Sequence, residues 1–461
     1  MTQRAAQHDL FASEPVRHSR LTPRRRPNGL IAAADLGASK AACLIASVLE
    51  SADGDIDIEV IGAGQQGIAP RDARTDRLGA AETAFRAALE AAERMAGERV
   101  RAVSISAPGR QLLSRRIGVD LDLAGGAVTA EDVLDCLREG AGLAAREGAR
   151  AIHAAPIDFS VDGEKTGANP CGYVGDILSA ELVGLAVRDG YDGNMRALLE
   201  RCDIGIDKIV PGPVATGEAV LIDDEKELGV TIIDMGARNT DFAVYEDGAL
   251  IGCGGVAMGG EHITRDLAHI FGGAIAHAER VKALHGSALA GLGDDHRFVD
   301  FPQLGENKNA LRAARADVSA VIAPRLEETL TLVREEAARV CAVAGGGHDA
   351  MGFERAHRGM RRAVLTGGGS LLTGARETAE RIFGVKTRLG RPVSLTGAPD
   401  AASSAQFSAC VGALLSRARP HQDIRTAARF GADTDYRRID TLALKRRGVL
   451  ASAAEWLKAN F

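Results

Sequence analysis

Hydrophobic and polar positions along the chain repeat one short pattern twice. In residues 31–48, an apolar run ends in Asp35-Leu-Gly, and a second apolar run follows it. About 200 residues later, residues 230–245 show the same order around Asp234-Met-Gly. Each pattern predicts a strand, a tight turn that carries Asp and Gly, and a second strand. Two such hairpins at this separation predict a duplicated α/β domain with a cleft between its halves.

Helical spacing follows each predicted hairpin. Residues 80–95 and 318–340 carry apolar side chains three and four positions apart, which predicts amphipathic helices. Pro324 predicts a kink or a new helix start inside the second of them. The glycine-rich stretch 62–67 follows a predicted strand at 56–61 but opens no helix, so we expect it to be a loop. This alternation of strands and helices is typical of the α/β class.

Composition and charge narrow the classes of partner. The chain has 461 residues, a formal net charge of −6 and 4% aromatic residues. Both ends, residues 1–29 and 417–461, are basic, so the middle is strongly acidic. An acidic body repels nucleic acid, and scarce aromatic residues argue against stacking on single strands, so no nucleic-acid partner is expected. The basic ends are free to meet an anionic surface such as phospholipid.

Cysteine usage and hydropathy exclude two further possibilities. Seven scattered cysteines with no C-x-x-C spacing predict reduced thiols in a cytoplasm rather than disulfides or a zinc site. No apolar run is long enough to predict a membrane-spanning helix.

A third glycine-rich element completes a possible phosphate site. The apolar stretch 363–366 runs into Gly367, Gly368 and Gly369, and a helical pattern follows at 375–383. Consecutive glycines let the backbone pass flat against a ligand, at the start of a helix whose N-terminus favours anions. In the two hairpins, backbone N–H groups beside Gly can reach phosphate oxygens, and Asp can hold Mg²⁺ through its waters.

These three elements, in this order, resemble the motifs of the actin/Hsp70/sugar-kinase ATPase superfamily. The residues at 35–40 are similar to its first phosphate motif, those at 234–241 to its second, and those at 365–370 to its adenosine motif. Residues 401–415 are similar to the superfamily's late helix, which crosses back between the domains. Further matches are similar to the FtsA family of bacterial cell-division proteins; they lie at 226–229, 259–266, 278–286 and 322–325, and in the last fifteen residues.

The resemblance implies an α/β, actin-like, ribonuclease-H-like duplicated fold of two domains, with an inserted subdomain and a C-terminal amphipathic helix. The implied segments are a disordered basic N-terminus at 1–28, a first domain at 29–97 and 181–207, the inserted subdomain at 98–180, a second domain at 208–258 and 306–385 with a small subdomain at 259–305, a return helix at 386–416, a linker at 417–445, and the amphipathic helix at 446–461.

The resemblance also implies a function. The family binds ATP between its two halves, polymerises into protofilaments, and binds the C-terminal tail of the tubulin-like FtsZ. It thereby holds FtsZ on the cytoplasmic side of the inner membrane at the division septum, as a peripheral membrane protein. Other division proteins are expected to bind the inserted subdomain. We expect at most a slow ATPase, because no side chain is identified as a general base.

Site residues carry over motif by motif. Phosphates are expected near Gly37, Ser39, Lys40, Gly236, Asn239 and Thr240, the nucleoside near Gly367, Gly368 and Gly369, and the ribose or base near Glu279 and Lys282. Asp35 and Asp234 are expected to hold Mg²⁺ through water, and Arg315 and Arg325 to meet the FtsZ tail. Ala237, Arg238 and Asn239 replace Gly, Gly and Thr of the family's second motif, which bears on fast hydrolysis more than on binding. Arg238 is expected to pair with the γ-phosphate or to point outward.

The last sixteen residues predict a short amphipathic helix. Its apolar stripe consists of Val449, Leu450, Ala453, Trp456, Leu457 and Phe461, and Arg446 and Arg447 precede it. Such a helix suits the interfacial plane of an anionic bilayer, where each copy binds weakly and a polymer binds strongly. The alternative is that the helix docks on the body; the polar linker before it, roughly 30 residues long, favours a tether.

Two other functions stay open at this point. One is a small-molecule kinase on the same scaffold, which requires a carboxylate as base beside a substrate hydroxyl. The other is an actin-like scaffold of a pilus system such as PilM, which does not need the amphipathic tail.

Overall fold

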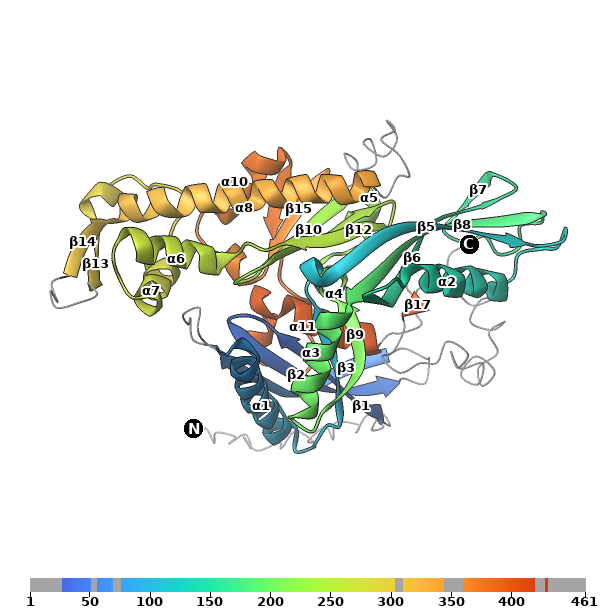
Figure 1. Ribbon diagram of the computed structural model, residues 1–461, viewed down its shortest axis with the longest axis horizontal. Helices are drawn as coiled ribbons and strands as arrows, with labels where there is room; N and C mark the ends of the chain where they lie inside the picture. The colour runs from blue at the N-terminus through green and yellow to red at the C-terminus, as the bar shows by residue number, and fades with distance from the viewer. Residues whose placement is uncertain are drawn as a thin grey trace, which may run out of the picture.

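The computed structural model describes residues 27–50, 56–68, 76–302, 310–343 and 360–418, together with the two-residue strand 428–429. Two five-stranded sheets, an inserted subdomain and a small helical subdomain make up this part of the chain (Figure 1). Of the expected disordered N-terminus at 1–28, residues 1–26 lie outside the described residues, whereas Pro27 and Asn28 begin the strand Pro27–Leu36. The expected amphipathic helix at 446–461 also lies outside the described residues. No helix in the described part is both long and apolar enough to cross a bilayer.

The first sheet is built on the first predicted hairpin. Its strand order is β3-β2-β1-β4-β9, with β1 and β2 antiparallel and β4 and β9 parallel to β1. Helix α1 crosses this sheet so closely that a Cβ on Gly62 or Gly64 of β3 would overlap a backbone carbonyl of the helix. The predicted loop at 62–67 is therefore wrong, because these glycines continue β3 under α1. The elements are β1 (Pro27–Leu36), β2 (Lys40–Glu50), β3 (Ile56–Gly67), α1 (Arg77–Ala96), β4 (Ala102–Ala107) and β9 (Gly205–Pro211).

The second sheet repeats the pattern, which confirms the predicted duplication. Its order is β12-β11-β10-β15-β16, with β10 and β11 forming the second hairpin. Helix α8 covers it as one uninterrupted helix with Pro324 inside, so no new helix starts there. The elements are β10 (Val230–Met235), β11 (Thr240–Glu246), β12 (Ala249–Val256), α8 (Arg315–Val343), β15 (Arg362–Thr366), α10 (Ala375–Phe383) and β16 (Lys386–Leu389).

The inserted subdomain has its own hydrophobic core between a sheet and one helix. Its strands are β5 (Leu112–Asp122), β6 (Ala149–Val161), β7 (Glu164–Gly167) and β8 (Ile177–Arg188), and its helix is α2 (Ala130–Ala144). The expected bounds of 98–180 shift, because β4 belongs to the first sheet and β8 continues to Arg188. Within the expected linker, β17 (Ala428–Arg429) pairs with β6.

The small subdomain extends the second half of the molecule. It contains α6 (Gly260–Ile270), α7 (Ile275–His285), β13 (Phe298–Pro302) and β14 (Ala310–Ala314). Phe271 stacks on Phe301 with the ring centroids 4.5 Å apart. Because β14 pairs with β13, the subdomain reaches beyond the expected end at residue 305.

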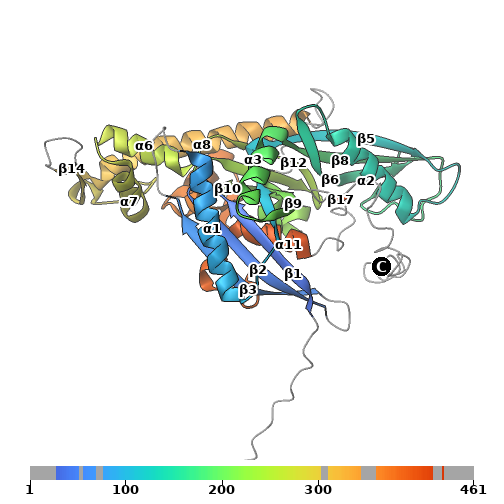
Figure 2. The same ribbon diagram turned by 60° about the horizontal axis from the view of Figure 1, so that its bottom comes forward.

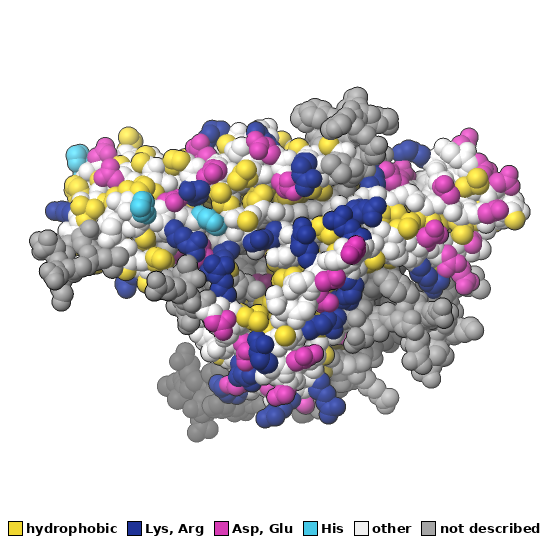
Figure 3. All heavy atoms as spheres, viewed as in Figure 1, with side chains coloured by type: hydrophobic (Ala, Val, Ile, Leu, Met, Phe, Trp, Pro, Cys, Tyr) yellow, Lys and Arg dark blue, Asp and Glu magenta, His cyan; other side chains and the backbone are white. Residues whose placement is uncertain are grey.

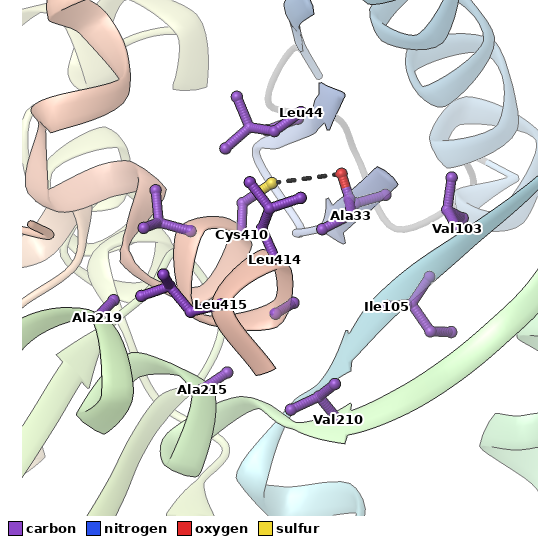
Figure 4. Close-up of a cluster of buried hydrophobic side chains, with 14 of the residues drawn as sticks. Ala33, Leu44, Val103, Ile105, Val210, Ala215, Ala219, Cys410, Leu414 and Leu415 are labelled. Carbon is purple, nitrogen blue, oxygen red and sulfur yellow. Dashed lines mark hydrogen bonds between the residues drawn. The ribbon is translucent and has the colours of Figure 1, made fainter. Parts of the chain in front are cut away.

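Two helices lie side by side in the core behind the first sheet (Figures 1 and 4). They are α4 (Gly212–Val220) and α11 (Ser408–Ala418), the expected return helix, which begins later than predicted because two 3₁₀ turns precede it. Cys410 of α11 donates its S–H to the carbonyl of Ala33 in β1 at 3.6 Å. Helix α3 (Asp189–Glu200), which follows β8, and the short α5 (Asp223–Leu228) complete the fold.

Charge is distributed unevenly over the surface. On the face in Figure 3, Lys and Arg side chains gather across the middle of the molecule, whereas acidic side chains are frequent toward the inserted subdomain. The acidic side chains that dominate the middle of the sequence are thus distributed unevenly over this face of the molecule.

Candidate functional site

The two hairpins and the glycine-rich turn line one cavity of about 720 Å³ between the two halves of the molecule. Of the predicted residues, it is lined by Asp35, Gly37, Ser39, Lys40, Asp234, Gly236, Asn239, Glu279, Lys282, Gly367, Gly368 and Gly369. Thr240 is the exception: it is fully buried, and its hydroxyl donates to the Met258 carbonyl at 2.8 Å. The side chain of Thr240 therefore does not face this cavity.

Carboxylates meet where the two hairpins approach each other. Asp35 Oδ1 accepts a hydrogen bond from Ser106 at 2.8 Å, and Asp234 Oδ2 accepts one from Thr216 at 2.8 Å. Burial raises the pKa of Asp234 to about 6, and the charge of Asp35 acts in the same direction. Asp241 lies directly across the β10–β11 ladder from Asp234 and also lines the cavity. Burial raises the pKa of Asp241 to about 8.

Lys40 supplies the cation at this corner. Its ammonium donates to the carbonyl oxygen of Gln406 and lies 4.1 Å from the centre of the Phe407 ring. Burial lowers the pKa of Lys40, whereas the charges of Asp35 and Asp234 oppose this shift. The ammonium is therefore held beside the carboxylates by the 3₁₀ turn that precedes α11.

Within the described part of the chain, the buried Oδ1 of Asn239 has no hydrogen-bond partner, and Asn239 lines the cavity. Asp241 lines the cavity as well, but its Oδ1 lies against Gly255 and Gly109. Mg²⁺ prefers oxygen ligands and keeps several of its waters, which can donate hydrogen bonds to such oxygens. In the described part of the chain, no three Asp, Glu, His or Cys side chains are arranged to bind a metal ion directly. The corner thus fits a hydrated divalent cation that the aspartates hold through water.

Arg238 is held at the rim of the cavity. Its guanidinium makes a two-pronged ion pair with Glu261, and Arg265 donates to the same carboxylate at 2.6 Å. Burial acts to raise the pKa of Glu261, but the hydrogen bonds from Arg238 outweigh it, so the pKa lies below its ordinary value. Neither expectation for Arg238 describes this state, because Glu261 binds the side chain.

Lys282 and Glu279 form a second polar cluster in the cavity wall. Lys282 Nζ donates to the Gly260 carbonyl at 2.9 Å, to Thr264 Oγ1 at 2.8 Å and to Glu279 Oε2 at 2.7 Å. The ammonium is therefore fixed between α6 and α7 and is not a solvated surface group. A ribose or base at this wall would meet both a cation and a carboxylate.

The glycine-rich turn lies against the second hairpin. Gly367 has φ +81°, and a Cβ there would overlap Asp234 Oδ1 and come within 2.7 Å of the Met235 nitrogen. A Cβ on Gly369 would lie 2.8 Å from Met235 Cβ. Around Gly368 there is more room, since the nearest atom, Gln406 Cγ, is 3.6 Å from such a Cβ. Two of the three glycines are thus required by the protein's own close packing.

Arg315 and Arg325 do not form one cationic surface. Arg315 lines the cavity, with its Nε 3.9 Å from Asp294 Oδ1. Arg325 donates to Asp266 and Glu328, each at 2.6 Å. Both arginines are already paired with acidic side chains of the protein itself.

Two protein-family models match segments of this chain. A family model described as "Cell division protein FtsA" matches residues 231–412, and one for the SHS2 domain inserted in FtsA matches residues 109–184. Cell division protein FtsA of Rhizobium meliloti is 33% identical over 416 residues, which cover 88% of this chain and 91% of the relative. The chain belongs to the FtsA family. The resemblance inferred from the sequence motifs is therefore confirmed.

A more distant FtsA relative and one solved structure agree with this placement. FtsA of Escherichia coli is 28% identical over 386 residues, covering 84% of this chain and 89% of the relative. The PilM–PilN type IV pilus biogenesis complex contains a chain of similar fold, with a TM-score of 0.57, 15% identity, and coverage of 84% of this chain and 98% of that one. The actin-like α/β fold with an SHS2 insert is thus confirmed for this FtsA-family member.

Sequence reasoning missed several residues of the cavity. Asp241 is the last residue of the second phosphate motif, and its position across the hairpin from Asp234 is a signal that the sequence contains. Glu261 lay inside another quoted match, but its pairing with Arg238 depends on how α6 folds back. Ser106 and Gln406 come from distant segments, and no local pattern marks them.

Proposed function

We propose that this protein is an ATP-binding, actin-like cell-division protein that polymerises and tethers FtsZ to the cytoplasmic face of the inner membrane at the division septum. Membership of the FtsA family supports the division role. The observation that carries ATP binding is a cavity that both acidic hairpins and the glycine-rich turn share.

Each side of the cavity has a task in this proposal. Backbone N–H groups at the two hairpin turns, with Lys40, bind the phosphates. Asp35 and Asp234 hold Mg²⁺ through its waters, and Asn239 and Asp241 line the same cavity. The cation supplies charge neutralisation for the triphosphate. The Glu279–Lys282 pair binds the ribose or base, beside the turn at Gly368.

Binding is expected to dominate over turnover. Ala237 and Arg238 bring side chains to positions where the family has bare backbone, and Glu261 holds Arg238 at the rim. Cations and neighbouring groups hold the carboxylates that line the cavity. We therefore assign none of them as a general base. ATP then acts mainly as a structural ligand that joins the two halves.

The membrane and FtsZ parts of the proposal rest on the sequence pattern and on the family. The stripe around Trp456 and the preceding Arg446 and Arg447 suit an anionic bilayer. Because β17 pairs with β6, residues 430–445 of the expected linker separate this anchor from the body in the sequence. Because Arg315 and Arg325 are paired internally, an acidic FtsZ tail would have to displace Asp294 or Asp266 to bind them. Other division proteins would bind the SHS2 insert.

Co-sedimentation of the full chain with FtsZ and anionic liposomes, with and without Mg²⁺-ATP, tests the proposal. Wild type should carry FtsZ into the liposome pellet, more so with ATP, because a polymer binds through many anchors. Trp456→Glu should abolish co-sedimentation, and the matched control Trp456→Phe should keep most of it. Failure of wild type to bind ATP, or full pelleting of Trp456→Glu, would overturn the corresponding part.

A further inference from the structure

The inserted subdomain is connected to the cavity through residues 106–111, here called the lead-in segment, which run from β4 to β5. Ser106, the last residue but one of β4, donates its hydroxyl to Asp35 of the first hairpin at 2.8 Å. The 3₁₀ turn Gly109–Gln111 then leads into β5. One end of the lead-in segment is therefore hydrogen-bonded to Asp35 in the turn of the first hairpin.

The other end of the lead-in segment touches the second half of the molecule. A Cβ on Gly109 would overlap the carbonyl oxygen of Gly254 in β12. A Cβ on Gly255 would overlap Asp241 Oδ1 and lie 3.0 Å from the backbone nitrogen of Arg110. The backbone N–H groups of Gly109 and Arg110 favour the charged form of the Asp241 carboxyl. With this little space, the lead-in segment cannot keep its place if β11 and β12 shift relative to β4.

The chain that leaves the insert returns to the same point. Tyr191, on α3 directly after β8, donates its hydroxyl to the Ser106 carbonyl at 3.1 Å. The next residue, Asp192, accepts two hydrogen bonds from Arg150 of β6, at 3.0 and 3.2 Å. The incoming and outgoing connections of the insert are thus tied together, and both are tied to Asp35.

We infer that the lead-in segment couples occupancy of the cavity to the orientation of the SHS2 insert, with Tyr191 as a positioning residue. This inference rests on the proposed nucleotide binding. A ligand that draws the two hairpins together also moves Asp35 and Asp241, which are the two sides on which the lead-in segment is held. When the cavity is filled, the insert is held in one orientation relative to the two halves. When the cavity is empty, the insert is held less tightly.

Hydrogen exchange of the full-length chain, with and without saturating Mg²⁺-AMPPNP, measures this coupling. In wild type, ligand should slow exchange at the two hairpins, in the lead-in segment and along β5. Tyr191→Phe removes one hydroxyl outside the cavity lining, so nucleotide affinity should stay within about twofold of wild type, whereas losing one hydrogen bond should speed exchange of the lead-in segment in the bound state roughly fivefold. Tyr173→Phe, the same change at an exposed position of the insert, is the matched control and should match wild type.

The outcomes separate the coupling from nucleotide binding itself. Protection that stops at the hairpins in a nucleotide-bound wild type would overturn the coupling and leave the proposed function standing. Equal protection of the lead-in segment in wild type and Tyr191→Phe would overturn the role of Tyr191. A chain that binds no nucleotide in a parallel fluorescence titration would overturn the proposed function, and the coupling with it.

Discussion

The close contact between α4 and α11 makes a single added methyl group costly. A Cβ on Gly412 of α11 would overlap the carbonyl oxygen of Ala215 in α4 and lie 2.8 Å from its Cα. These are backbone atoms, which cannot rotate away as a side chain can. We therefore predict that Gly412→Ala destabilises the first half of the molecule.

The magnitude follows from two opposing effects. Replacing Gly by Ala inside a helix stabilises it by about 1 kcal/mol. Forcing an extra carbon into a packed core costs about 1–3 kcal/mol, and more where neighbours cannot move. The overlap with backbone places this site at the upper end, so the net loss should be about 2 kcal/mol or more. For a unit of 150–250 residues, this corresponds to a melting temperature lower by about 4 °C or more.

Gly193, at an exposed position of α3, offers a control on a helix whose Leu198 and Leu199 belong to the same hydrophobic core. It lies inside α3, and a Cβ there would meet nothing within 4 Å. Gly193→Ala should therefore raise the melting temperature by about 2 °C, since only the helix-propensity gain of about 1 kcal/mol remains. Scanning calorimetry of both variants measures the two shifts. A Gly412→Ala variant that melts at or above wild type would refute the reasoning.

Three further predictions concern the cavity. Because burial raises the pKa of Asp241 to about 8, ionising it costs stability as pH rises toward and through 8; Asp241→Asn should therefore gain in melting temperature relative to wild type between pH 5 and pH 9 in nucleotide-free protein, and a constant difference would contradict this. Glu261→Gln should release Arg238 toward the phosphates and tighten ATP relative to ADP roughly fivefold, since a charge-assisted hydrogen bond becomes available; isothermal titration with both nucleotides checks it, and an unchanged ratio would count against it. Lys282→Met should weaken nucleotide binding roughly tenfold without lowering the melting temperature of the first half, whereas unchanged affinity would remove Lys282 from the site.

Local patterns were enough to predict the hairpins and the helices. The order of apolar run, Asp-x-Gly and apolar run specifies a hairpin by itself, so β1–β2 and β10–β11 lie where they were predicted. Helix α8 also forms along its predicted apolar stripe, although it contains Pro324. Val318, Ile322, Leu326 and Leu330 are all fully buried on one face, and this burial outweighs the hydrogen bond that Pro324 removes.

Features that depend on distant packing could not be predicted. The sequence around Gly62 and Gly64 is typical of a turn. These positions require glycine because the backbone of α1 passes directly over β3. Thr240 is buried and Asp241 lines the cavity, although they are neighbours on β11. This difference depends on which side of β11 faces the cavity, which the sequence does not reveal. The ion pairs Arg238–Glu261 and Arg325–Asp266 join residues 23 and 59 positions apart, so no local spacing could assign these partners.

Helix α8 gives the molecule a rigid strut along its long axis (Figure 2). Its first residue, Arg315, lines the cavity, and near its other end a Cβ on Gly252 of β12 would lie 2.7 Å from Val340 Cγ1. At 1.5 Å per residue, the helix spans about 43 Å. A tilt of a few degrees at the cavity would therefore displace the far end by several ångströms. Small rearrangements around a ligand would reach remote neighbours enlarged rather than dissipated.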